Sequence, residues 1–468
     1  MRIAYGTNGF ANHRLEDALE VIAELGYDGV ALTLDHHHLD PFAGDLPRRV
    51  AEVRGRLERL GLSVAVETGA RYLLDPRRKH HPTLVSDDVE RRVDFLERAV
   101  RVAAGLGAEV VSFWSGIRPS DVDSELAWRR MTDGLARVLE EAARCGVLLG
   151  LEPEPGMFVE RVDDALAVRA ALGNPRNLGV TLDVGHCVAV ETESAADCAR
   201  RLGELLVHVQ LDDMRPGVHE HLEFGQGELD LPGTLAALSE AGYTGQAAVE
   251  LPRHSHAAPE VARRARTAIG AAGWLADALA AIAEDPARVA ALFPAAGRHV
   301  GRGPLRADDP LGLVHGTADD RARGRMLAVL ARTVKPAALA EEVSALYRYG
   351  DDAERRAVLR SLSELDGSGP GGSDLVETGL ELVGDALRTN DVRLVAAALG
   401  PFAARHLDEH TWRHGVLKCL FTEVPLAAVA GWRRRRDAEL RRMVGAFADE
   451  RRAAGRPVPE DARALLES

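Results

Sequence analysis

Cysteine is scarce in this sequence. Its 468 residues include four cysteines, Cys145, Cys187, Cys198 and Cys419, and none of them stands in a C-x-x-C spacing. The scarcity and the scatter argue against a disulfide framework and against a zinc site built from cysteine. We therefore expect four reduced cysteines that serve as small apolar residues in the interior.

The sequence also lacks long apolar runs. No stretch of about 18 apolar residues, the length that a membrane-spanning helix needs, occurs in it. The chain begins with MRIAYGTNGF, without the basic segment, apolar stretch and small-residue cleavage site of a secretory signal. These absences predict a protein that has no membrane span and is located in the cytoplasm.

An excess of basic residues is absent as well. The formal net charge is −14 at pH 7, and the sequence pI is about 5.7. Because a polyanion such as DNA is normally met by a basic face, nucleic acid is not expected as a partner. The hydrophobic fraction of 46% and the charged fraction of 28% are typical of a globular protein. A chain of 468 residues is too long for one ordinary domain, so we expect two.

Short apolar runs that alternate with amphipathic helical patterns fill the first part of the chain. The runs read as eight strands at 3–6, 29–34, 62–68, 108–114, 147–152, 178–183, 205–211 and 246–251. Each run is almost continuously apolar, as in strands that are buried on both faces of a parallel sheet. Together they predict a closed (β/α)8 TIM barrel, because an open doubly wound sheet would favour a G-x-G-x-x-G after the first strand, and none is present.

The character of the sequence changes after the predicted barrel. Residues 287–324 are rich in Gly, Pro, Arg and Asp and have weak periodicity, which indicates a linker. Beyond them every segment has helical spacing with short polar turns. The predicted fold class is therefore α/β, with a TIM barrel at 1–286, a linker at 287–324 and an all-α helical domain at 325–468.

Functional side chains of a barrel gather where its strands end. Strand five ends at Glu152, strand six at Asp183 and strand eight at Glu250, and strand seven contains His208. Three carboxylates and one imidazole that converge on one mouth suit Mn²⁺, Mg²⁺ or Co²⁺ with positions left open for substrate. An acid at the end of a single strand is often only a helix cap, but four such residues on consecutive strands favour a metal site.

These motifs resemble the sugar-phosphate isomerase/epimerase superfamily of xylose-isomerase-like TIM barrels. The resemblance covers residues 1–275 and rests on LEPEPG (151–156), LDVGHC (182–187), HVQLDD (208–213), FGQGELD (224–230) and VEL (249–251). It implies metal ligation by Glu152, Asp183, His208 and Glu250, with Mn²⁺ as the first expectation and Mg²⁺, Co²⁺ or Zn²⁺ as the other options. It further implies that His186 and Arg215 hold substrate oxygens.

The predicted chemistry is proton transfer on a sugar, cyclitol or related polyol, phosphorylated or not. A metal on the carbonyl and hydroxyl oxygens would stabilise the enediolate that is left when a neighbouring carbon loses its proton. Glu152 and Glu250 are the candidate catalytic groups that move this proton, and we expect both to be ionised at neutral pH. Isomerisation and epimerisation both remain open.

Other residues at the predicted mouth are candidates for substrate contact. Glu67 and Arg71 follow strand three, and Trp114 ends strand four, where its indole could form a wall of the pocket. The neighbouring basic cluster 77–80 could receive a phosphate or phosphodiester, although a surface charge run fits it slightly better. We expect His219 and His221 to lie on a loop that closes the pocket, and 36–38 to be an exposed histidine triplet.

Two other functions stay open. An endonuclease IV-like zinc phosphodiesterase belongs to the same superfamily, but it needs histidines where strands three and four end, and here Glu67 and Trp114 stand there. A non-catalytic barrel that binds or carries a metabolite is the other.

Residues 325–468 resemble the EboA family through 331–351, 385–421 and 439–459. This resemblance implies a secondary-metabolite pathway, with a pathway protein or a second copy of the chain as a possible partner of the helical domain.

Overall fold

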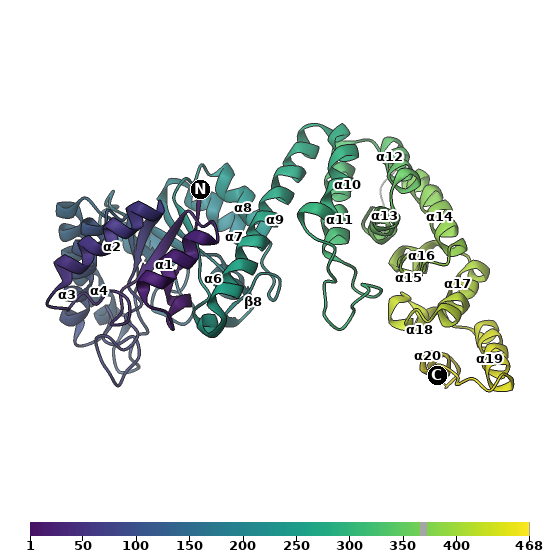
Figure 1. The fold of residues 1–468 in the computed structure, drawn as a ribbon, viewed down its shortest axis with the longest axis horizontal. Helices are drawn as coiled ribbons and strands as arrows, with labels where there is room; N and C mark the ends of the chain where they lie inside the picture. The colour runs from purple at the N-terminus through teal and green to yellow at the C-terminus, as the bar shows by residue number, and fades with distance from the viewer. Residues whose placement is uncertain (366–371, 468) are drawn as a thin grey trace. The chain divides into compact units, whose positions relative to one another are not determined.

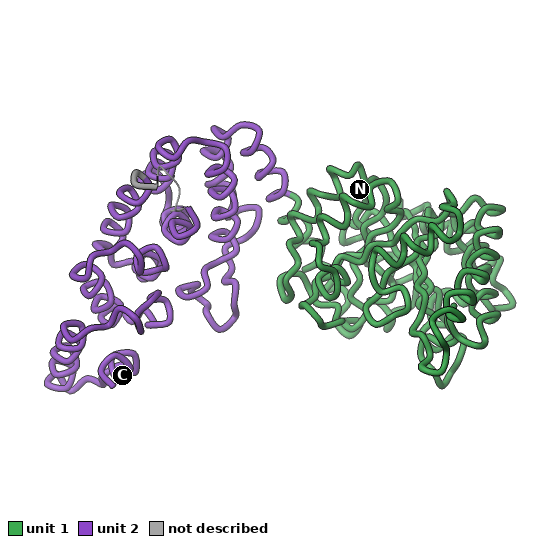
Figure 2. Tube along the Cα trace, turned by 180° about the vertical axis from the view of Figure 1, so that it is seen from behind, with its two compact units in different colours: residues 1–273 green, residues 274–468 purple. Residues whose placement is uncertain are grey.

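The computed structural model describes residues 1–365 and 372–467 (Figure 1). The chain forms two compact units, Met1–Gly273 and Trp274–Ser468 (Figure 2). Each unit has its own hydrophobic core.

The first unit contains a closed barrel of eight parallel strands. Its strands follow one another around the barrel in the order β1-β10-β7-β6-β5-β4-β3-β2. Their bounds are β1 (Arg2–Gly6), β2 (Gly29–Thr33), β3 (Ser63–Glu67), β4 (Val110–Trp114), β5 (Leu148–Glu152), β6 (Leu178–Asp183), β7 (Leu206–Leu211) and β10 (Gln246–Val249). The eight predicted strands and the predicted barrel are confirmed.

Helices cover the outside of the barrel, as parallel strands require a crossover between each pair. They are α1 (Leu15–Glu24), α2 (Leu46–Leu60), α3 (Val89–Leu106), α4 (Ser124–Cys145), α5 (Val162–Ala171), α6 (Val184–Val190), α7 (Ala195–Leu202), α8 (Leu231–Glu240) and the start of α9 (Ala258–Glu284), with short 3₁₀ turns η1 (Thr7–Phe10), η2 (Gly203–Leu205) and η3 (Pro252–Ala257). Helices α3 and α4 end at Gly107 and Gly146, whose φ angles of 72° and 69° let the chain turn back toward the next strand.

A short hairpin that was not predicted follows β7. Strands β8 (Asp213–Arg215) and β9 (Val218–Leu222) pair antiparallel in a sheet of their own. The buried Asp213 carboxylate fixes the segment behind the hairpin, because it accepts hydrogen bonds from the backbone N–H groups of Gly225, Gly227 and Leu229 at 2.8–2.9 Å. The stretch expected to be a loop that closes the pocket is therefore a hairpin arm that follows the end of β7.

The regular elements of the second unit in the described residues are helices, apart from an isolated β-bridge between Pro304 and Thr317. Its helices are the rest of α9, then α10 (Val289–His299), α11 (Ala318–Thr333), α12 (Pro336–Tyr349), α13 (Asp352–Leu365), α14 (Gly372–Arg388), α15 (Val392–Ala398), α16 (Pro401–His406), α17 (Glu409–Thr422), α18 (Trp432–Arg435), α19 (Ala438–Ala453) and α20 (Glu460–Glu467), with 3₁₀ turns η4 (Pro286–Arg288) and η5 (Leu426–Ala428). The predicted all-α character is confirmed. Trp412 and Cys419 are buried in its core.

The border between the units differs from the predicted one. The structure places it at 273/274, inside helix α9, whose Ile269 packs in the first core and whose Leu275 and Ile282 pack in the second. The predicted linker 287–324 contains helix α10 and the start of α11. Phe293 of α10 is fully buried, so this Gly- and Pro-rich stretch belongs to the helical core for part of its length.

One helical segment, Pro252–Glu284, is apolar enough by length and composition to be considered as a membrane span, with a mean hydropathy of 1.2. Core helices satisfy the same criterion. Because buried residues of this segment pack in both cores, we find no clear membrane span in residues 1–365 and 372–467.

Candidate active site

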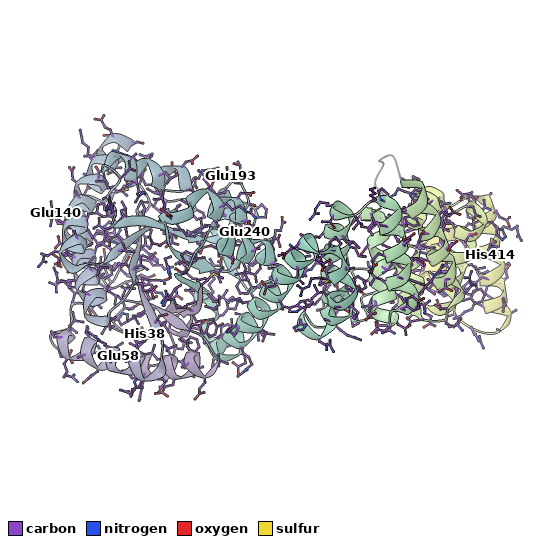
Figure 3. All side chains as sticks on the ribbon, turned by 90° about the horizontal axis from the view of Figure 1, so that it is seen from above. His38, Glu58, Glu140, Glu193, Glu240 and His414 are labelled. Carbon is purple, nitrogen blue, oxygen red and sulfur yellow. The ribbon has the colours of Figure 1, made fainter. Side chains whose placement is uncertain are left out.

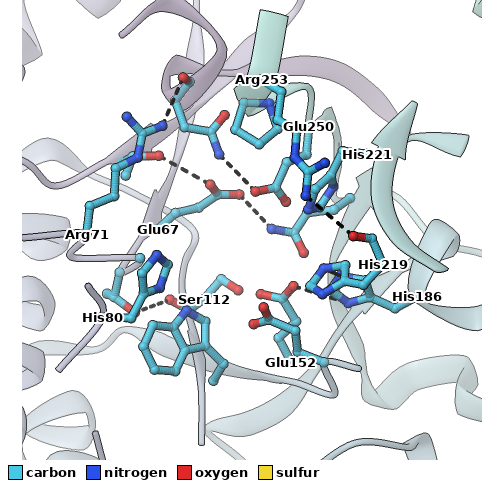
Figure 4. A pocket seen from close by; sticks show the side chains of 18 of the residues that line it. Glu67, Arg71, His80, Ser112, Glu152, His186, His219, His221, Glu250 and Arg253 are labelled. Atoms are coloured by element: carbon cyan, nitrogen blue, oxygen red, sulfur yellow. Dashed lines mark hydrogen bonds and ion pairs between the residues drawn. The ribbon is translucent and has the colours of Figure 1, made fainter. Parts of the chain in front are cut away.

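A cavity of about 430 Å³ lies where the barrel strands end (Figure 4). Its wall consists mostly of polar and charged side chains from the strand ends and the segments that follow them. They are Asn8, Thr33, Glu67, Thr68, Gly69, Arg71, Lys79, His80, Ser112, Trp114, Glu152, Glu154, His186, Gln210, His219, His221, Glu250, Pro252 and Arg253. The volume is sufficient for a small polyhydroxylated molecule.

Two glutamates of this wall are the predicted catalytic residues. Glu152 is the last residue of β5, and Glu250 follows β10 and continues its ladder through a backbone hydrogen bond to Leu211. Burial raises the pKa of Glu152 well above its usual range, and the charge of Glu250 adds to the effect. Burial likewise raises the pKa of Glu250, with a further contribution from Glu67. The expected ionised state of both glutamates therefore depends on a nearby positive charge.

Hydrogen bonds hold the carboxylates on this side of the barrel in place. Asn8 donates to Oε1 of Glu250 at 2.8 Å, and Oε2 of Glu250 is buried without a hydrogen-bond partner. Glu67 accepts hydrogen bonds from Gln210 at 3.1 Å and from Thr33 at 3.4 Å. The free oxygen of Glu250 is thus available to a substrate or a cation.

The end of β6 combines a carboxylate with an oriented imidazole. Asp183 caps helix α6, and its Oδ1 accepts a hydrogen bond from the His186 N–H at 2.9 Å, whereas its buried Oδ2 has no hydrogen-bond partner. Nδ1 of His186 lies 3.0 Å from the carbonyl oxygen of Pro153 and must donate to it. In a neutral ring this leaves Nε2 with a free lone pair, the state that binds a metal.

Strand β9 brings two further histidines to the same place. Nε2 of His219 lies 3.2 Å from Nε2 of His186, and Nδ1 of His221 lies 2.6 Å from the Asp212 carboxylate. Burial and the neighbouring His186 and His221 lower the pKa of His219 to about 4, and burial also lowers the pKa of His186. The rings of His186 and His219 are therefore neutral at pH 7 and able to act as ligands.

Three overlapping groups in the described part of the chain could hold a metal ion. They are His186 with His219 and His221, Glu152 with Asp183 and His186, and Asp183 with Asp212 and His221. Within each group the potential ligand atoms lie no more than 4.8 Å apart. The shared members place the candidate metal centre between the ends of β5 and β6 and the hairpin arm.

The structure does not bring His208 to this cavity. Its side chain is fully buried, and its Nε2 lies 3.6 Å from Oε1 of Glu67, a residue that does line the cavity. Side chains two positions apart on a strand share a face. Gln210, which is nearer to the end of β7 than His208, lines the cavity. Both ring nitrogens of His208 are buried without a hydrogen-bond partner in the described chain, and its role as a metal ligand stays a prediction.

Arg215 also lies outside the cavity. Its exposed guanidinium donates to the carbonyl oxygen of Gln226 at 3.2 Å, and its predicted role in holding substrate stays a prediction. A different arginine, Arg253 of η3, lines the cavity. The other predicted substrate contacts, Glu67, Arg71, Trp114, His186, His219 and His221, do line it, and their roles stay predictions.

Several wall residues were missed in the sequence. Gln210 could have been found, since it follows His208 on the same strand face and is closer to the strand end. Asn8, in the 3₁₀ turn η1 after β1, carries no comparable signal. The same holds for Arg253, which reaches the wall only because the chain turns through η3.

The fold and this polar mouth can be compared with known proteins. A family described as xylose isomerase-like TIM barrel matches residues 19–277. The chain belongs to this family. The xylose isomerase-like barrel is fused to an EboA domain, because residues 322–467 match the family described as metabolite traffic protein EboA.

Among characterised relatives of the xylose isomerase-like barrel is L-ribulose-5-phosphate 3-epimerase UlaE from Shigella flexneri. It is 26% identical over 243 residues, which are 50% of this chain and 81% of that protein. The structure of L-ribulose 3-epimerase covers 60% of this chain and 97% of its own, with 21% identity and a TM-score of 0.49. The structure of the IOLI protein with a binding zinc atom covers 57% and 95%, with 20% identity and a TM-score of 0.45. The barrel is thus distantly related to sugar 3-epimerases.

Proposed function

We propose that the protein is a divalent-metal-dependent isomerase or epimerase that transfers a proton next to a carbonyl group of a sugar, cyclitol or related polyol. The position of Glu152 and Glu250 carries this proposal. Both line one cavity, and β6 and β7 separate their strands in the barrel. Figure 4 shows the two carboxylates on opposite sides of the pocket, where a substrate between them would present one face to each.

The donor atoms of the site fit a divalent cation. Asp183 Oδ2, Glu250 Oε2 and Gln210 Oε1 are buried oxygens that have no hydrogen-bond partner in the described chain. Oxygen donors suit Mn²⁺, Mg²⁺ or Co²⁺, and an added imidazole also suits Zn²⁺. We assign Glu152, Asp183, His208 and Glu250 as ligands, since both ring nitrogens of His208 are also buried without a partner in the described chain. His186 is a further candidate ligand. A cation held there would stabilise negative charge on substrate oxygens.

The two glutamates perform the proton transfer. A hydrogen on the carbon beside a carbonyl is weakly acidic, and an ionised carboxylate above that carbon can remove it. Because burial favours the protonated form, the same carboxyl group can hold the proton afterwards. Return from the opposite glutamate inverts the carbon and gives epimerisation, whereas return to the adjacent carbon from the first glutamate gives isomerisation.

The wider setting is part of the same proposal. UlaE acts, by its name, on a phosphorylated ketose, which supports a sugar or polyol substrate here. The EboA domain supports a role in a secondary-metabolite pathway. We propose that the protein works in the cytoplasm and that the helical unit meets a pathway protein or a second copy of the chain.

Solvent deuterium exchange tests the proposed function. Purified protein is incubated in D₂O with ketoses, inososes and their phosphates, each with Mn²⁺, Mg²⁺ or Co²⁺, and deuterium at carbon is measured by NMR. We expect incorporation for at least one substrate and a loss of about 100-fold or more in Glu152→Gln and Glu250→Gln. Glu140→Gln, on the outer surface of α4 (Figure 3), is the matched control with unchanged exchange.

The same samples separate the competing functions. A protein that binds metal but incorporates no deuterium with any member of the panel would contradict proton transfer and favour metabolite carriage. Cleavage of a duplex with an abasic site, with more than one zinc per chain, would favour the phosphodiesterase. The three-histidine group is the observation that keeps this second function under test.

A further inference from the structure

The segment between β3 and α3 forms a small closed loop at one wall of the cavity. The His80 N–H donates to the carbonyl oxygen of Arg71, which brings the two ends of the loop together. His80 has a φ of 62°, a backbone conformation that is costly for a residue with a side chain and that is often found at functional sites. As a result Arg71, Lys79 and His80 all line the cavity.

The two cations of this loop that line the cavity, Arg71 and Lys79, have no carboxylate partner in the described chain. In the described chain, no Asp or Glu lies within the 4.0 Å ion-pair distance of Arg71 or Lys79, and Arg71 donates a hydrogen bond to the carbonyl oxygen of Asn8 at 3.2 Å. By contrast, Arg253 on the other side of the mouth is paired with Glu220 at 3.3 Å. Arg71 and Lys79 therefore keep charged donors that no carboxylate of the described chain occupies. They leave donors free for a ligand.

His80 adds a neutral donor beside the cations. Its Nε2 is buried without a hydrogen-bond partner, and its ring packs against Trp114 with a centroid distance of 5.4 Å. Burial and the nearby charges of Lys79, Arg92 and Arg71 lower the pKa of His80 to about 4. The neutral ring can therefore offer an N–H to an anion without needing a proton from solvent.

A third positive charge lies behind this wall. The guanidinium of Arg92 is fully buried, 4.1 Å from the centroid of the Trp114 ring, and its Nε and one terminal nitrogen have no hydrogen-bond partner in the described chain. It donates to the carbonyl oxygen of Thr68, and it is not paired with a carboxylate. Buried charge acts over longer distances than exposed charge, so Arg92 makes this wall more attractive to anions.

We infer that Arg71, Lys79 and His80 form a subsite that binds the anionic group, a phosphate or a carboxylate, of a polyhydroxylated substrate. This inference rests on the proposed function, because the glutamates would act on the carbonyl end of the same molecule. The substrate then spans the cavity, with its reactive carbons between Glu152 and Glu250 and its anion at the β3 loop. Neutral sugars lack the group that this loop recognises.

Anion binding to the intact protein tests the subsite without any turnover. Inorganic phosphate and acetate are titrated separately by calorimetry into the wild type, Arg71→Met, Lys79→Met and the conservative variant Arg71→Lys. We expect the Met variants to bind the preferred anion about tenfold or more weakly, since a hydrogen bond to a charged group is lost. Arg71→Lys keeps the charge and retains part of the affinity. Arg77→Met removes one charge from the same loop outside the cavity and is the matched control.

The outcomes separate the two anion types and the two proposals. Tighter binding of phosphate assigns a phosphorylated substrate, and tighter binding of acetate assigns a sugar acid. Equal weakening in Arg71→Met and Arg77→Met, or no binding of either anion to the wild type, would overturn the subsite. If anions bind through Arg71 but no substrate exchanges deuterium, the proposed function fails and the subsite stands. Equal deuterium exchange with neutral and phosphorylated ketoses would contradict the subsite but not the proposed function.

Discussion

Nε2 of His186 and Nε2 of His219 lie 3.2 Å apart at the barrel mouth, although they belong to helix α6 and to the hairpin strand β9. Because Nδ1 of His186 donates to the carbonyl oxygen of Pro153, its Nε2 has a lone pair directed at the second ring. Two such nitrogens at this distance share either a proton or a cation. What the two nitrogens share therefore depends on whether a metal ion is bound at the mouth.

Removing His186 should weaken metal binding. In His186→Gln we expect the affinity for Co²⁺ to fall about tenfold or more, since an oriented imidazole ligand is replaced by an amide. Optical titration of the d–d bands measures this directly. His37→Gln, which changes an exposed histidine outside the cavity, should bind Co²⁺ like the wild type. Equal affinity in both variants would show that the cation sits elsewhere in the barrel.

Much of the barrel and its carboxylates could be predicted from the sequence. Strands buried on both faces appear as apolar runs, and the ends of parallel strands meet at one mouth, so Glu152, Asp183 and Glu250 could be grouped without a structure. These inferences need only local pattern and the closure of the barrel. The same reasoning gave the helical second unit, since helical spacing is also a local property.

The positions of the imidazole groups relative to the mouth could not be predicted in the same way. Alternation shows that His208 and Gln210 share a face of β7, but the depth of each below the mouth depends on where the strand ends in space. The position of His219 depends on the β8–β9 hairpin, which is fixed by hydrogen bonds from residues 225–229 to Asp213. Such contacts between distant segments leave no periodic signal in the sequence.

Asp213 should be important for the hairpin arm. In Asp213→Asn one acceptor oxygen becomes an N–H₂ group that faces backbone donors, so we expect a loss of about 2 kcal/mol in the free energy of unfolding. Urea denaturation measures the loss, and weaker Co²⁺ binding should accompany it. Asp40→Asn, whose side chain accepts one hydrogen bond from the backbone of Phe42, is the matched control. If the two variants were equally stable, the segment would not depend on the Asp213 carboxylate.

A buried ion pair should control the stability of the helical unit. Arg323 and Asp319 on α11 are fully buried and contact each other, and Arg323 also donates to the carbonyl oxygen of Phe293. Arg323→Met removes the contacting partner of the buried Asp319 charge and leaves it only Arg356 at 3.6 Å, which we expect to cost about 3 kcal/mol. Hydrogen exchange in α11 measures this for the second unit alone. Arg321→Met, an exposed position on the same helix, should change exchange little, and equal protection in both variants would contradict the assignment.

His80 should make the stability of the protein fall as the pH is lowered. Its pKa is about 4 in the folded protein and 6.5 without the surrounding structure, so between these values the unfolded chain binds a proton that the folded chain does not. The free energy of unfolding then decreases as the pH falls from 6.5 toward 4, and the contribution of His80 is fully present above pH 6.5. His80→Gln should show a smaller decrease over this range in denaturant titrations at several pH values, whereas the exposed His37→Gln should follow the wild type. The same slope in His80→Gln and the wild type would mean that His80 already accepts its proton in the folded state. The imidazole would then add a positive charge beside Arg71 and Lys79 near neutral pH.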